Sequence, residues 1–430
     1  MGKTKQEYSI QKRGGSYRVT VSNGYTPDGK KIQIKQTFRP SEGLPATQEQ
    51  KRLNAFALEL VKKVKSGHKF DFDKMPFKDF AGKWLEEVQK HKVSERTLQG
   101  YSDLLRLHVF PYIGTVKLQN INVSAVQSLL QYLLEKKSKT GRMLTPQGIK
   151  KIFAVLSMIF KQAVKWRVLS ENPCGFIDLP TQQRKPLENF FTIEQAKTFL
   201  EIISSPFSVH RGERTRRNCK GVPYTVKAYT ETKTVPLQLR LFFHLAIFAG
   251  LRRGEAVALS WNDIDFIKGV IRINKAVTRL KSGQIIKETK NYSSNRNISI
   301  PSFLVDMLKD WQEKQNGNRQ KLGDRWRGED FIFIQWDGKQ MDINTPSHAF
   351  KKIIDRYNTG NENKLPNITL HGLRHSFATF QIAGGIDVRT VSGRLGHSNA
   401  STTLNIYTHF LEENERKATA CLENLLHREE

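Results

Sequence analysis

Residues 249–266 read AGLRRGEAVALSWNDIDF, residues 371–379 read HGLRHSFAT, and residues 395–409 read LGHSNASTTLNIYTH. Each stretch places charged or polar side chains where helix packing would not require them. Arg252 directly follows an apolar run, and an arginine beside a buried element needs a fixed anion or a buried carboxylate such as Glu255. His371 and Arg374 are three residues apart, so on a helix they share one face. The three stretches are therefore the first place to look for chemistry.

Considered singly, these residues also have structural explanations. Arg252 could simply neutralise Glu255, and a buried tyrosine is more often part of a core than a nucleophile. His371 and His375 have the spacing of half a zinc site, but no third ligand at a suitable spacing and no HExxH glutamate accompanies them. None of the stretches alone establishes a catalytic site.

Together, two arginines, a lysine, two histidines and a tyrosine suit the transfer of a phosphodiester through a covalent tyrosyl intermediate. A phosphodiester is anionic and repels a phenolate, so Arg252 and Arg374 would hold its two non-bridging oxygens and neutralise the charge that develops. The phenol of Tyr407 has an ordinary pKa of about 10, so nearby cations must help to deprotonate it. A lysine would protonate the departing 5′ oxygen.

The same stretches resemble the motifs of the tyrosine recombinases, particularly the phage and conjugative-transposon integrases with an N-terminal arm-binding domain. AGLRRGEAVALSWNDIDF resembles the first arginine box, HGLRHSFAT the His-x-x-Arg box, and LGHSNASTTLNIYTH the final histidine-to-tyrosine segment. The resemblance covers nearly the whole chain and is most specific over residues 249–265 and 371–409. It implies that Glu255 supports Arg252 and that no metal or cofactor is used. The catalytic set that it implies is Arg252, Lys290, His371, Arg374, His397 and Tyr407.

Two lysines compete for the lysine position of the family. In the family this lysine lies in a β-turn, a few residues before an arginine and a hydrophobic strand, which here begin at Arg296. Lys290 has the better spacing, and Lys287 is the alternative.

Composition supports a nucleic-acid partner. The 430 residues carry 70 Lys and Arg against 41 Asp and Glu, a net charge of +29 that favours a polyanion such as DNA. The apolar run at residues 241–251 is too short to span a membrane, and the N-terminus lacks the apolar core of a signal peptide, so we expect a cytoplasmic, DNA-associated bacterial protein. Three isolated cysteines exclude a disulfide framework and a cysteine-based zinc site.

The chain is expected to be multidomain. Strand-like alternation followed by one helix predicts a small α+β domain with a three-stranded sheet over residues 1–70. This segment contains 15 Lys and Arg and 5 Asp and Glu. Helical periodicity predicts an all-α domain over residues 75–180, and residues 188–430 are expected to form a mixed, mainly α domain with a small antiparallel sheet. By resemblance these are the arm-binding, core-binding and catalytic domains.

Three helix starts are predicted from local chemistry. Ser124 and Thr145 are expected to be N-caps, the latter followed by a proline at the first helical position, and Thr192 with Gln195 has the pattern of a capping box.

Residues 205–236 interrupt the last domain with a basic segment that has no clean period. The segment is either a surface that contacts DNA or an insertion without a function of its own.

The resemblance implies an integrase, a site-specific recombinase that cuts and rejoins double-stranded DNA through a 3′-phosphotyrosine and integrates or excises a mobile element. Four protomers would act in pairs through a Holliday junction, on core and arm sites, with DNA-bending or excision proteins as possible helpers. The alternatives are a type IB topoisomerase, which shares the tyrosine chemistry, and a non-catalytic DNA-binding regulator. No GxxxxGK[ST] pattern occurs in the sequence, and rejoining that conserves bond energy needs no ATP.

Overall fold

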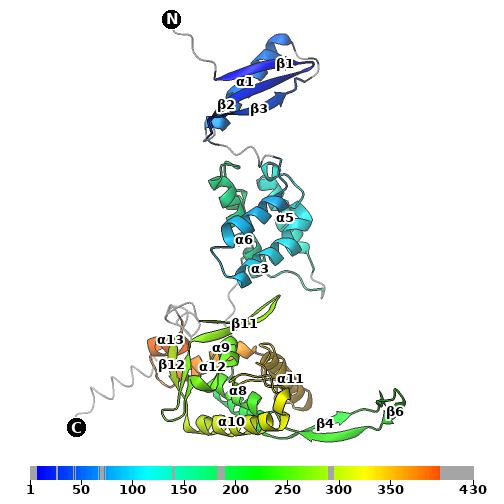
Figure 1. The fold of residues 1–430 in the computed structure, drawn as a ribbon, viewed down its shortest axis with the longest axis vertical. Helices are drawn as coiled ribbons and strands as arrows, with labels where there is room; N and C mark the ends of the chain where they lie inside the picture. The colour runs from blue at the N-terminus through cyan, green and yellow to red at the C-terminus, as the bar shows by residue number, and fades with distance from the viewer. Residues whose placement is uncertain are drawn as a thin grey trace, which may run out of the picture. The chain divides into compact units, whose positions relative to one another are not determined.

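The computed structural model describes residues 7–25, 28–41, 43, 45–65, 67, 72, 74–137, 141–181, 189–288 and 295–397. The chain divides into two compact units, residues 1–184 and 185–430 (Figure 1). The described part of the first unit holds two separate hydrophobic cores, and that of the second holds one large core and a smaller cluster.

The N-terminal part of the first unit is a three-stranded antiparallel sheet covered by one helix. The strands β1 (Tyr8–Arg13), β2 (Ser16–Tyr25) and β3 (Lys31–Phe38) pair in the order β1-β2-β3. Val19 and Val21 of the central strand are buried against the apolar face of α1 (Ala46–Lys65). The strands of a sheet with one covered face alternate apolar and polar residues, and this alternation is what predicted the strands from the sequence.

The rest of the first unit is helical, with a core that is rich in aromatic side chains. Phe77, Phe80, Trp84 and Phe160 are at most 1% exposed. Thr145 caps the longest helix of this part, as predicted, because its side chain accepts a hydrogen bond from the N–H of Gly148 at 3.1 Å. The helical segments are α2 (Phe77–Lys83), α3 (Glu95–Leu104), α4 (Phe110–Ile113), α5 (Val123–Glu135) and α6 (Pro146–Lys165), with π-helical turns at Trp84–Gln89 and Leu105–Val109 and 3₁₀ turns at Leu118–Asn120 and Pro173–Phe176.

The predicted cap of α5 is wrong. Asn122, two residues before Ser124, holds the N-cap and accepts a hydrogen bond from the N–H of Ala125 at 2.9 Å. Ser124 lies inside the first turn and binds Ser128 through its backbone carbonyl. Asn and Ser are both preferred at the N-cap, so the sequence alone does not decide which of the two residues caps the helix.

The second unit packs helices around small antiparallel sheets. Its helices are α7 (Ile193–Ser204), α8 (Leu237–Phe248), α9 (Arg253–Ala258), α10 (Ser302–Leu322), α11 (Thr345–Gly360), α12 (Leu370–Ala383) and α13 (Val388–Leu395), with 3₁₀ turns at Trp261–Asp263 and Gly323–Arg325. The predicted capping box at the start of α7 is present, with Thr192 and Gln195 each accepting from the other's N–H. The core is built around α8, whose Leu241, Phe242 and Phe243 are buried.

Two sheets lie between α9 and α10 in the sequence. One has the order β12-β9-β8, formed by Ile264–Asp265 (β8), Val270–Ile273 (β9) and Arg296–Ser299 (β12). The other is the hairpin of Lys275–Leu280 (β10) and Gly283–Glu288 (β11). These strands confirm the small antiparallel sheet, and with the first unit they confirm the predicted fold class.

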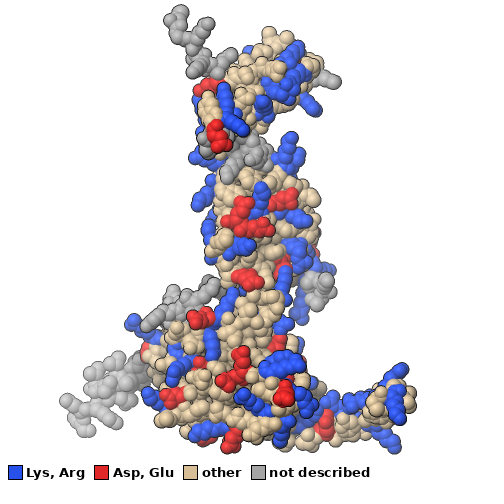
Figure 2. All heavy atoms as spheres, in the orientation of Figure 1, with Lys and Arg blue, Asp and Glu red and all other residues tan. Residues whose placement is uncertain are grey.

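The basic segment within residues 205–236 forms a two-stranded ribbon, which the sequence analysis did not predict. Phe207–Arg211 (β4) pairs with Tyr229–Lys233 (β7), and Arg214–Arg217 (β5) pairs with Pro223–Val226 (β6). We call the segment from β4 to β7 the ribbon. It projects away from the helices of the second unit (Figure 1). On the face shown in Figure 2, Lys and Arg side chains are spread over each unit and gather at the far end of the ribbon.

No helix within the described ranges is long and apolar enough to cross a membrane.

Candidate active site

Arg252 occupies the N-cap of α9. Its guanidinium donates a hydrogen bond from Nη1 to Oε1 of Glu255 at 2.7 Å and another from Nη2 to the carbonyl oxygen of Gly396 at 2.9 Å. Its backbone N–H donates to Oε2 of the same glutamate at 2.9 Å. The side chain remains 36% exposed, so it is fixed in direction while one side stays open to a ligand.

Glu255 bridges two arginines. Besides Arg252 it accepts two hydrogen bonds from Arg296, at 3.2 Å from Nη1 and 2.8 Å from Nη2, and the side chains of Glu255 and Arg296 are 3% and 6% exposed. Burial by itself raises the pKa of Glu255, but the hydrogen bonds and charges of Arg296 and Arg252 outweigh burial and lower this pKa to about 2. The carboxylate is therefore ionised throughout the physiological range. The sequence marks Arg296 only as the arginine that follows the lysine position, and nothing in it indicates the pairing with Glu255.

Arg374 is the most buried arginine of the site, at 2% exposed. It reaches across from α12 and donates to the carbonyl oxygen of Gly250 at 2.6 Å and to that of Leu395. The carbonyl of Gly250 points at Arg374 because this glycine has φ of +60°, and a Cβ there would lie 2.5 Å from the ring of Phe377. A glycine is thus required where the first arginine box begins.

His397 follows the end of α13 directly. Gly396 ends this helix in the left-handed conformation with φ of +64°, a turn that glycine adopts without strain. The turn brings the carbonyl oxygens of Leu395 and Gly396 to Arg374 and Arg252. Burial, followed by the positive charges of Arg374 and Arg252, lowers the pKa of His397 to about 4. The imidazole is neutral at pH 7, although it stands among cations.

His371 lies in the first turn of α12, one turn before His375. The two rings meet edge to face, with centroids 4.7 Å apart. Burial first, then the charges of Arg374 and Arg252, lower the pKa of His371, and burial with His371 and Arg374 as neighbours lowers the pKa of His375 to about 4. A neutral imidazole has one nitrogen that accepts a proton and one N–H that donates a hydrogen bond, whereas an imidazolium can only donate.

Of the six predicted site residues, the structure brings four together from three segments of the chain. They are Arg252, His371, Arg374 and His397. Lys290 and Tyr407 lie outside the described residues. The competing Lys287 is described: it is half-buried within β11, opposite Ala276 of β10.

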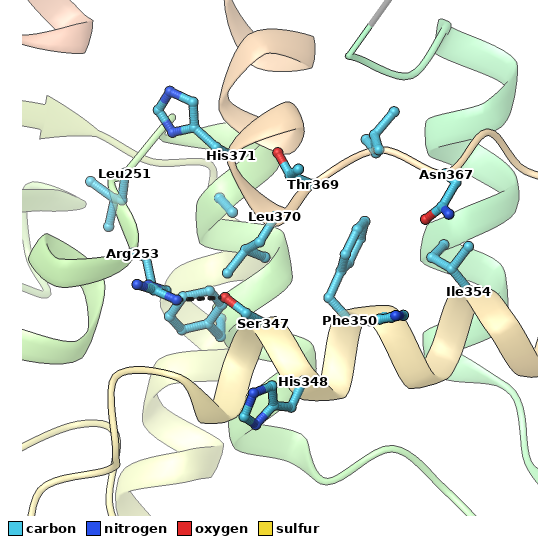
Figure 3. Close-up of a pocket in the computed structure, with 14 residues that line it drawn as sticks. Leu251, Arg253, Ser347, His348, Phe350, Ile354, Asn367, Thr369, Leu370 and His371 are labelled. Atoms are coloured by element: carbon cyan, nitrogen blue, oxygen red, sulfur yellow. Dashed lines mark hydrogen bonds between the residues drawn. The ribbon is translucent and has the colours of Figure 1, made fainter. Parts of the chain in front are cut away.

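A cavity of about 600 Å³ lies beside this cluster, between α8, α11 and α12 (Figure 3). Arg253 is tied there to Ser347 by a hydrogen bond of 2.9 Å, and Phe350 and Leu370 contribute to an apolar lining. Of the four described residues of the predicted set, only His371 contributes to its wall. Arg252, whose side chain is 36% exposed, is therefore accessible outside the cavity, which suits a bulky polymeric substrate better than a small enclosed one.

Comparison with known proteins agrees with the geometry. Residues 225–414 match the phage integrase family, and residues 76–134 match the N-terminal SAM-like domain of phage integrases. The chain belongs to the phage integrase family.

The matches extend over nearly the entire chain. A XerC-like tyrosine recombinase of Caldanaerobacter subterraneus subsp. tengcongensis is 27% identical over 95% of this chain and 96% of its own. The ICEBs1 integrase of Bacillus subtilis is 26% identical over 97% of this chain and 100% of its own. The structure of the Tn1549 transposon integrase in complex with transposon right end DNA is similar in fold, with a TM-score of 0.62 and 21% identity over 81% of this chain and 100% of that one. The protein is thus an enzyme of the tyrosine recombinase class that catalyses site-specific recombination of a mobile element.

The shared carboxylate of Glu255 makes a thermodynamic prediction. Glu255→Gln should destabilise the second unit by about 3–5 kcal/mol, because it leaves the buried guanidinium of Arg296 without its carboxylate. Arg296→Met should cost less, because Glu255 keeps its hydrogen bonds from Arg252. The double variant should lose less than the sum of the two. Calorimetric unfolding of the four proteins measures the coupling, and additive losses would contradict the buried pair.

Proposed function

We propose that Tyr407 is the nucleophile of this recombinase and that Arg252, His371, Arg374 and His397 hold and activate the scissile phosphate. The observation that carries the proposal is the convergence of Arg252, Arg374 and His397 on the turn that ends α13, with His371 close enough to both arginines for their charges to lower its pKa. The chain continues from that turn, and Tyr407 follows His397 by ten residues.

The first chemical step exchanges one ester for another. The phenolate oxygen of Tyr407 forms a bond to phosphorus, the bond from phosphorus to the 5′ oxygen breaks, and the product is a 3′-phosphotyrosine with a free 5′-hydroxyl. Arg252 and Arg374 bind the non-bridging oxygens, where negative charge builds up. His397 donates a hydrogen bond to the phosphate, and His371 accepts the proton that Tyr407 loses.

The second step is the reverse of the first with a different strand. A 5′-hydroxyl from the partner DNA attacks the phosphotyrosine and releases Tyr407. One phosphodiester is lost and one is gained, so the reaction needs neither ATP nor a resident metal. Lys290 protonates the 5′ oxygen as it leaves and takes the proton back when the new strand attacks.

The roles of the domains follow from the family arrangement. We assign residues 188–430 to catalysis, residues 75–180 to binding of the core site, and residues 1–70 to binding of separate arm sites. Four protomers would exchange strands in pairs through a Holliday junction, with DNA-bending or excision proteins as further partners. The reaction would take place in the cytoplasm, where bacterial DNA is found.

Two other functions make different predictions. A type IB topoisomerase would relax a supercoiled plasmid without joining two sites, and a DNA-binding regulator would do neither. A relaxation assay run beside a two-site recombination assay separates the three, and the similarity to the integrases of mobile elements favours recombination.

The nucleophile can be tested directly. Tyr407→Phe removes the attacking oxygen and retains the ring, so it should abolish the covalent protein–DNA adduct on a nicked suicide substrate while DNA binding persists. The adduct is measured by denaturing gel electrophoresis. An adduct that survives this substitution would overturn the assignment.

The lysine can be tested by changing the leaving group. Lys290→Ala should slow cleavage about 10²–10⁴-fold, the usual contribution of a general acid. A 5′-bridging sulfur leaves without needing a proton, so a phosphorothiolate substrate should restore the rate.

Lys287→Ala is the matched control, because its lysine lies within β11 and not in the segment just before Arg296. It should slow cleavage less than tenfold and show no rescue. The opposite pattern would move the role to Lys287.

The arm assignment predicts a selective loss of affinity. Deletion of residues 1–70 removes a segment with 15 Lys and Arg against 5 Asp and Glu. Binding to a core-site duplex should be unchanged, and binding to a longer attachment-site fragment should weaken, as measured by gel shift. Equal affinity of both proteins for both fragments would refute the arm-binding role.

A further inference from the structure

We propose that the far end of the ribbon binds double-stranded DNA, at a segment other than the one held at the active site. This binding surface is defined as residues 212–228, which we call the tip; they contain β5, the turn and β6. That this segment differs from the one at the active site rests on the proposed function, whereas the contact of the tip with DNA does not.

The base of the ribbon is anchored, and part of its positive charge is paired. Phe207 packs against the core of the second unit, and the guanidinium of Arg356 lies 3.3 Å from the centre of its ring. Glu231 accepts from Nε of Arg211 at 2.8 Å and pairs with Nζ of Lys233 at 3.0 Å. Arg211, Lys233 and Glu231 together leave one positive charge, against four at the tip, and they hold the strands in place.

The tip has the opposite character. It contains five Lys and Arg and one Glu. The exposed cations Arg216, Arg217, Lys220 and Lys227 form no ion pair with the described part of the chain. A two-stranded ribbon without a covering layer is marginally stable in water, so this concentrated charge costs stability unless an anionic partner compensates for it.

The turn at the tip is built to hold its shape. The side chain of Asn218 accepts hydrogen bonds from the N–H groups of Lys220 and Val222 at 3.0 and 2.9 Å. Gly221 adopts φ of +78° and donates to the carbonyl oxygen of Asn218. The basic side chains are thus presented on a fixed frame, which reduces the entropy lost on binding.

The register of the strands spreads the cations over both faces. Arg216 pairs with Tyr224 and shares its face, whereas Arg217 pairs with Pro223 on the other face. The ring of Tyr224 is 48% exposed beside Arg216. The major groove of DNA is about 12 Å wide and admits a two-stranded ribbon, so cations on both faces can reach the phosphates of both groove walls.

The location of the tip determines which DNA it can reach. In Figure 1, α13, which ends two residues before His397, and β6, at the far end of the ribbon, lie at opposite sides of the second unit. The tip is therefore separate from the turn on which Arg252 and Arg374 converge. A flanking segment or a second duplex fits this geometry.

A second copy of this chain fits less well than DNA. The chain carries a net charge of +29, so two copies repel one another unless an acidic patch meets the tip. A duplex presents one negative charge for about every 1.7 Å of its axis and needs no such local match.

The salt dependence of DNA binding tests the proposal. Arg216→Gln/Arg217→Gln/Lys220→Gln removes three tip cations, and Lys268→Gln/Lys309→Gln/Lys364→Gln removes three exposed lysines elsewhere on the second unit as a matched control. For full-length protein on a 40-bp duplex of arbitrary sequence (a length of roughly four helical turns), the slope of log K against log salt should fall by about 2–3 for the tip variant. An equal slope in the tip variant and the control would overturn the proposal.

Crosslinking of the otherwise native ribbon gives an independent reading. Cys219 is exposed at the tip, whereas burial raises the pKa of the Cys174 thiol to about 12, so a maleimide at pH 7 labels Cys219 selectively once Cys421→Ser is introduced. A benzophenone attached to Cys219 should capture DNA on irradiation, and Cys219→Ser should abolish capture. Capture of a second protein copy alone would replace DNA by a protein partner and refute the proposal.

The tip variant should still form the covalent adduct on a nicked suicide substrate at saturating protein concentration. Loss of the adduct with an unchanged salt slope would contradict the tip contact and indicate an effect on the active site. A smaller salt slope with a normal adduct supports the tip contact.

Discussion

The buried guanidinium of Arg374 imposes the main constraint on the second unit. It is 2% exposed, and it must find acceptors inside the protein because water cannot reach it. The acceptors are backbone carbonyls of Gly250 and Leu395, which belong to different segments of the chain. Satisfying one side chain therefore fixes the end of α8, the start of α12 and the end of α13 relative to each other. The glycine at 250 and the left-handed turn at Gly396 follow from the same need, because both direct carbonyl oxygens inward.

The balance of charge explains why a carboxylate, Glu255, lies among the arginines of the site. Three arginines, Arg252, Arg296 and Arg374, meet at one carboxylate and a few carbonyls, so Glu255 compensates only part of their charge. Its two oxygens hold Arg252 and Arg296 in fixed directions, which a carbonyl with one oxygen cannot do as well. The surplus of positive charge favours an anion at the exposed side of Arg252. A phosphodiester supplies such an anion, and the protein is thereby prepared for its substrate before the substrate arrives.

The sequence predicted the elements whose residues face a core or a backbone and missed those that face water on all sides. The capping box at Thr192 and the cap at Thr145 could be predicted from the sequence because each provides a hydrogen-bond acceptor for the free N–H groups at the start of a helix. Strands β5 and β6 of the ribbon could not be predicted, since three of the four residues of each are exposed and no apolar alternation marks them. Arg252 and Arg374 were found through their local motifs. Their partner Arg296 lies 41 residues from Glu255, and no periodicity connects such distant residues.

The neutral histidines resolve an apparent conflict in the proposed reaction. A site that stabilises a phosphorane-like transition state needs positive charge. A histidine in that site can accept a proton only if it is not already protonated. Burial and the neighbouring arginines prevent this protonation by lowering the pKa of His371 and holding that of His397 at about 4. In the proposed reaction, an anionic phosphate would offset the arginine charges and raise the pKa of His371. His371 would then accept the tyrosine proton more readily once the substrate is bound, while His397 donates its hydrogen bond to the phosphate.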